Sequence, residues 1–171
     1  MNAIDILTYG QRTVRQAIEG IADDEWDQGG ACGSWSMKDI VSHLASYERL
    51  LEDILSSLLA DDATPYLDQW RSDPAAFNDP QVAARAGSSV HTVLDELEAA
   101  HKNTLSLIGR IPEERRRQPG TLPWYGAAYA LDDVIVYMYY GHKREHAAQI
   151  AAFRDRLRAA PPSVVLSAAT R

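Results

Sequence analysis

Residues 131–150 read LDDVIVYMYYGHKREHAAQI, and this stretch decides which fold the chain can adopt. VIVYMYY alone would suit a buried strand, but the periodic pattern that continues to Arg158 favours one long helix. His142 and His146 are four residues apart, so at about 100° per residue both imidazoles lie on one face of that helix. The same side carries apolar and aromatic residues together with one amide, so the histidines are predicted to point into the core: Ile135, Met138, Tyr139, Gln149 and Phe153.

Three earlier segments also have helical periodicity, which predicts an all-α four-helix bundle with long crossover loops. They run from about Ile4 to Ile21, from Met37 to Ala60, and from Asp79 to Ile111 with a break near Gly87. Residues 29–33, GGACG, are predicted to form a loop. Residues 61–80 and 111–129 are predicted to be irregular, the former a crossover or lid. We expect one domain over residues 1–158 and a flexible tail over 159–171.

The composition narrows the class of partner. The chain has 171 residues, 46% of them hydrophobic, and a formal net charge of -7. This charge argues against binding to nucleic acid or to an anionic membrane surface, and favours a small-molecule ligand. A single cysteine, Cys32, excludes an intrachain disulfide and suits the reducing cytoplasm. The N-terminus has no apolar run typical of a signal peptide, and no later stretch reaches bilayer length.

His43 is the natural third partner of the late histidine pair. Ser36 and Asp39 form a reciprocal capping pattern that starts a helix at Met37, and His43 lies on its apolar stripe. Three neutral imidazoles would bind a divalent ion such as Zn²⁺ and leave a coordination position open, as catalytic sites do. The alternative is three core histidines whose ring nitrogens bond tyrosine hydroxyls or backbone carbonyls.

Two further histidines are poorer candidates. His101 lies among charged neighbours in EAAHKNT, as expected of a solvated helix face, and His91 is near a helix start. Neither is excluded by spacing alone.

Tyrosines lie about one turn from the candidate ligands. Tyr47 follows His43 and Tyr139 precedes His142, so both hydroxyls are candidate catalytic groups, with core packing as the alternative. Asp39 is placed to cap its helix and also to accept the ring proton of His43.

Several other side chains have two interpretations. Glu145 is either a residue that supports the metal ligands or a charged residue of the surface. Cys32 is either a nucleophile in a glycine-bearing loop or incidental. The aromatic residues Trp35, Trp70 and Trp124 suit either a ligand wall or ordinary packing.

Two motifs resemble the DinB/YfiT-like metal-binding four-helix bundles. The first is GSWSMKDIVSHLASYE, residues 33–48, in which Trp-Ser-x-Lys-Asp leads to one histidine. The second is His-x-x-x-His followed by Ala-x-Gln-Ile in residues 142–150. The resemblance covers most of the chain and assigns His43, His142 and His146 as metal ligands. It implies nickel, zinc or iron, and frequently a homodimer.

The resemblance also bears on function. Some relatives are transferases or isomerases that use mycothiol, bacillithiol or glutathione. LPWYG, residues 122–126, looks like the branch that includes colibactin self-resistance proteins. We therefore expect a metal-dependent hydrolase or thiol-dependent transferase in stress response or detoxification. The alternative is a protein that sequesters a small molecule without turnover.

Overall fold

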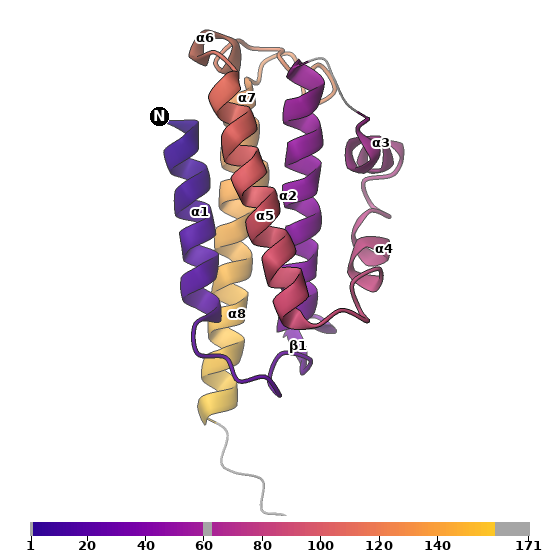
Figure 1. Cartoon of the computed structure of the whole chain (residues 1–171), viewed down its shortest axis with the longest axis vertical. Coiled ribbons are helices and arrows are strands. Elements are labelled where there is room, and N and C mark those ends of the chain that lie inside the picture. The colour runs from indigo at the N-terminus through magenta and orange to yellow at the C-terminus, as the bar shows by residue number, and fades with distance from the viewer. Residues whose placement is uncertain (1, 60–62, 160–171) are drawn as a thin grey trace, which may run out of the picture.

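The structure is a computed structural model that describes residues 2–59 and 63–159. It confirms the all-α prediction, because long helical segments run side by side as a bundle (Figure 1). They are α1 (Ala3–Ile18), α2 (Met37–Leu59), α5 (Val90–Arg110), and a continuous last segment made of α7 (Leu131–Val134), η1 (Ile135–Gly141) and α8 (His142–Ala159). The expected end at Ala60 and the tail beyond residue 159 lie outside the described residues.

The bundle is built from two helix pairs. α2 packs mainly against α5, whereas α1 packs mainly against α8 and η1. The break expected near Gly87 is confirmed, since a new helix, α5, begins at Val90. Ser89 caps this helix, because its Oγ accepts a hydrogen bond from Thr92 N at 3.1 Å. α1 ends at Ile18, three residues before the predicted boundary, because Glu19 is extended and Gly20 has a φ of 72°. Within the described residues, every helix is too short or too polar to serve as a membrane span.

The predicted loop at residues 29–33 is wrong in part. Strands β1 (Gly29–Cys32) and β2 (Trp35–Ser36) pair antiparallel, with Cys32 opposite Trp35. Gly33 turns the chain between them with a φ of 59°, a conformation that glycine adopts readily. Strands this short carry too few residues for an alternating pattern to be recognised.

The two connections predicted as irregular also contain helical turns. α3 (Pro65–Ser72) and α4 (Asn78–Ala83) lie on the outer side of α2 (Figure 1), and α6 (Glu113–Arg116) follows α5. Asp53 of α2 accepts hydrogen bonds from the backbone N–H groups of Tyr66 and Leu67 at 2.7 and 3.1 Å, which caps α3. This cap is supplied from another helix, so local sequence could not reveal it.

A buried polar layer separates two apolar clusters of the core. One cluster contains Leu7, Leu51 and Tyr139, and the other contains Val14 and Leu44. Between them along the four long helical segments lie four polar side chains, one from each segment: Gln11, Glu48, His101 and Lys143.

The contacts within this layer are short. Lys143 Nζ is 2.6 Å from Glu48 Oε2 and donates to Gln11 Oε1 at 2.8 Å, while Glu48 Oε1 lies 2.9 Å from His101 Nδ1. The expectation that His101 faces solvent is wrong, because it is only 4% exposed. The charged residues beside His101 in the sequence suggested a solvated helix face. They could not show that its partner is Glu48 of α2.

The buried polar layer makes the stability of the fold depend on pH in the acid range. Although burial by itself would raise the pKa of Glu48, the charge of Lys143 and the His101 hydrogen bond lower this pKa from 4.5 to about 2. A carboxyl whose pKa is lower in the folded state than in the unfolded state stabilises the fold at any pH above its unfolded-state pKa. That contribution is lost as the pH falls towards the folded value.

We therefore expect the free energy of unfolding to decrease more steeply between pH 5 and pH 2 in the native chain than in Glu48→Gln/Lys143→Met. Urea titrations of metal-free protein across that range measure the difference. The double variant keeps every other carboxyl, so parallel curves for the two proteins would contradict the assignment.

Candidate metal centre

His43 is positioned by the capped start of α2. Ser36 N donates to Asp39 Oδ2 at 2.9 Å, and Asp39 N donates to Ser36 Oγ at 3.1 Å, which confirms the predicted capping. The Trp35 ring packs against the His43 imidazole, with the ring centroids 5.1 Å apart. The Asp39 carboxylate is not a partner of His43, because His43 Nδ1 is buried without a hydrogen-bond partner among the described residues. Asp39 thus has only the capping role.

His142 and His146 come from the start of α8. His142 is the first residue of that helix, directly after the π-helix η1, and His146 lies one turn later. π-helical turns inside longer helices are frequent at functional sites. The predicted long helix is confirmed, but its π-helical segment has no counterpart in the sequence pattern.

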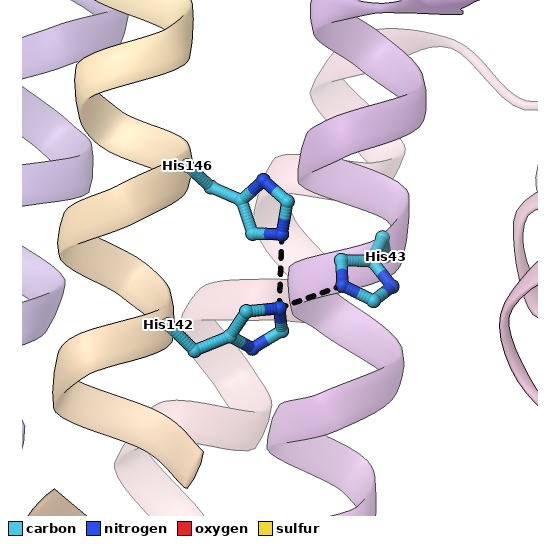
Figure 2. Close-up of side chains that lie close together, drawn as sticks. All are labelled: His43, His142 and His146. Atoms are coloured by element: carbon cyan, nitrogen blue, oxygen red, sulfur yellow. Dashed lines mark hydrogen bonds between the residues drawn. The ribbon is translucent and has the colours of Figure 1, made fainter. Parts of the chain in front are cut away.

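The three imidazoles meet at their Nε2 atoms (Figure 2). His142 Nε2 is 2.8 Å from His43 Nε2 and 2.9 Å from His146 Nε2. One ligand atom from each residue lies within 4.8 Å of the others, as a shared metal ion requires. The structure thus brings together the three residues that the sequence singled out.

Burial keeps the three rings neutral. It lowers the pKa of His43 to about 2, with further lowering by the charges of His142 and His146. Burial also lowers the pKa of His142 to about 3, helped by His146 and Lys143. The pKa of His146 is lowered by burial as well, and the hydrogen bond that His146 donates to Gln149 partly offsets this lowering. Neutral imidazole is the form that binds a metal ion.

The hydrogen-bond chemistry of the triad fits a cation. His146 Nδ1 is 2.8 Å from Gln149 Oε1, so Nδ1 carries the proton and Nε2 presents a lone pair. His142 Nε2 faces two other Nε2 atoms, and a single N–H cannot point well at both. Three converging lone pairs are satisfied together by a positive ion. Gln149 is therefore a supporting residue whose role the sequence analysis missed, although its position three residues after His146 was a usable signal.

A cleft of about 470 Å³ reaches the triad at His142. Its walls are formed by Tyr47, Tyr137, Met138, Gly141, His142 and Glu145. Glu145 thus lies beside the site on its open side. A volume of this size suits a small molecule.

The two candidate tyrosines occupy different places. The Tyr47 ring lies 4.7 Å from His43 and 4.5 Å from His142 between centroids, in the wall of the cleft. Burial raises its pKa, partly offset by a hydrogen bond from Trp70 of α3. Tyr139 is 1% exposed and is not part of that wall. Burial, followed by the charge of Glu48, raises the pKa of Tyr139 well above its ordinary value.

The other candidates lie outside the triad. His91 is exposed and His101 belongs to the polar layer. Cys32 is half-buried on β1. Trp70 and Trp124 make an edge-to-face contact with 5.3 Å between centroids and pack against the apolar core, so the connections carrying them are joined by aromatic contact.

A comparison with known protein families matches residues 8–136 to the mycothiol maleylpyruvate isomerase N-terminal domain. The chain belongs to this family. The family is DinB-like, which confirms the resemblance found in the sequence. The match includes His43 and Tyr47 but ends at Val136, so the family assignment does not rest on His142 or His146. No curated protein and no solved structure matches the chain.

Gln149 should control metal affinity through His146. Gln149→Leu removes the acceptor that holds the imidazole, and outer-shell changes of this kind cost about 10- to 100-fold in affinity. Gln149→Glu should retain or strengthen binding, because a carboxylate is the stronger acceptor. Isothermal titration with Co²⁺ compares both variants with the native chain, and equal affinities for the native chain and Gln149→Leu would contradict this role.

Proposed function

We propose that the chain is a metal-dependent enzyme acting on a small molecule, with His43, His142 and His146 as ligands of a divalent ion such as nickel, zinc or iron. The observation that supports this best is the convergence of three neutral Nε2 atoms beside a cleft. A bound ion with three protein ligands would supply Lewis acidity and an open coordination position. A structural zinc site would instead have four protein ligands, and the described residues around the triad offer three.

The residues of the cleft supply the rest of the proposed site. Tyr47 is placed to orient a substrate beside His142, because its ring forms part of the cleft wall and lies 4.5 Å from the His142 ring between centroids. Met138 and Tyr137 offer apolar surface, while Glu145 contributes a carboxylate at the opening. Tyr139 stays a candidate from sequence, with its hydroxyl in the bundle interior near the charge of Glu48.

A thiol-dependent transfer or isomerisation is our first choice of reaction, and hydrolysis at the same site is the second. The family description names mycothiol and maleylpyruvate, and we extend to this chain a low-molecular-weight thiol as co-substrate. A role in detoxification or stress response follows from this choice. The cytoplasmic location and the homodimer stay predictions, and ligand sequestration without turnover is the competing function.

Metal content tests the proposal directly. Protein purified without a histidine tag should hold about one divalent ion per chain after reconstitution, as a three-histidine site predicts. His142→Ala should lose most of this metal, whereas His91→Ala, which changes an exposed histidine, should not. Elemental analysis gives the stoichiometry, and a native chain with under about a tenth of an ion would remove the proposal.

Tyr47→Phe separates catalysis from sequestration. The variant keeps the ring and the metal ligands, so metal content should be unchanged while turnover falls by about 10- to 100-fold. The assay follows maleylpyruvate consumption with mycothiol, with and without metal. A stoichiometric complex from which the ligand is recovered unchanged would favour sequestration instead.

A further inference from the structure

The triad joins two helices that each have their main packing partner elsewhere in the bundle. α2 is packed mainly on α5, and α8 mainly on α1, while α2 and α8 also contribute residues such as Leu44 and Ile150 to one apolar cluster. His43 must nevertheless lie within hydrogen-bonding distance of His142 across this boundary. Apolar attraction has no preferred direction, so a directional contact between the two helices would define their register more sharply.

The polar layer supplies such a contact next to the triad. Lys143 follows His142 directly, and Glu48 lies five residues after His43 on α2. Lys143 Nζ and Glu48 Oε2 are 2.6 Å apart, and these side chains are 3% and 0% exposed. The ion pair thus crosses the same boundary as the triad, within two turns of it on both helices.

We propose that Glu48 and Lys143 are positioning residues of the metal centre, whose ion pair sets the register of α2 and α8 that brings His43 to His142 and His146. The inference rests on the proposed metal site. It adds residues that do not touch the ion or the substrate and that act through the imidazoles.

The physical reason is the steep distance and angle dependence of a buried ion pair. Moving α8 by one residue along its axis shifts it by about 1.5 Å, which would separate Lys143 from Glu48 and leave both charges unpaired in the core. Apolar side chains at the same positions would tolerate such a shift, because their attraction has no preferred direction. Buried polar pairs are known to define register in helical assemblies.

Each charge is also held from a third and a fourth helix. Gln11 of α1 accepts from Lys143 at 2.8 Å and donates through Nε2 to Glu98 Oε1 at 2.8 Å. His101 of α5 holds the other oxygen of Glu48 at 2.9 Å. The pair is therefore fixed relative to the whole bundle, and it transmits that position to the triad.

The test compares Lys143→Met and Glu48→Gln/Lys143→Met with the native chain. The single variant leaves Glu48 buried and unpaired, which threatens folding, whereas the double variant leaves no buried charge at this position. The control is Arg85→Met, which removes a buried guanidinium that bonds Glu96 at 2.7 and 2.8 Å and has no contact with the triad. Circular dichroism and urea titration first identify a temperature at which each protein is folded.

The readouts are the Co²⁺ affinity and the visible spectrum of the Co²⁺-saturated protein, which reports ligand geometry rather than stability. We expect both folded variants of the pair to bind Co²⁺ at least about tenfold more weakly and with a changed spectrum, as displaced ligands require. Arg85→Met should lose stability but keep the native affinity and spectrum.

Three results would overturn the proposal. The first is native affinity and spectrum in the folded double variant, and the second is an equal loss in Arg85→Met. The third is failure of both pair variants to fold, which would assign the pair to stability alone. If the native chain fails to bind Co²⁺, the proposed function is overturned instead. This result is obtained from the native chain alone, so the two failures are distinguishable.

Discussion

Two opposite charges buried in the middle of a helical bundle constrain everything around them. Removing either charge from water is unfavourable by several kcal/mol, about as much as their attraction returns, so the pair is tolerated only where further hydrogen bonds complete it. Each charge has one such bond from the other two long helices, because His101 contacts Glu48 Oε1 and Gln11 accepts from Lys143. The layer divides the apolar core and ties all four long helical segments to one relative arrangement.

The imidazoles beside this layer differ from it, because they are buried without charge. Their Nε2 atoms face one another, and burial lowers the pKa of His43 to about 2 and that of His142 to about 3, so these two rings are neutral at neutral pH. Neutral rings avoid the desolvation penalty of a buried cation and keep their lone pairs available. A polar layer that satisfies its own charges thus lies next to a triad whose lone pairs are left for an incoming ion.

The family match and the triad support the proposed function independently. The match ends before His142, so the candidate metal centre rests on tertiary geometry and not on the assignment of a family. The last helix completes the site through a π-helical segment that ends where His142 begins. The same segment carries Tyr137, Met138 and Gly141 to the cleft, which couples access to the triad with the placement of its ligands.

The sequence by itself determined the all-α class, the Ser36 and Asp39 cap, and the face that His142 and His146 share, since these depend on residues within one or two turns. It also selected His43 as the third candidate ligand, from its place on an apolar stripe. Only the tertiary structure showed that His101 is buried, that Asp53 caps α3, and that Glu48 pairs with Lys143. In each of these cases the partner lies on another helix or far along the chain, and helical periodicity says which face is buried without saying what lies opposite it.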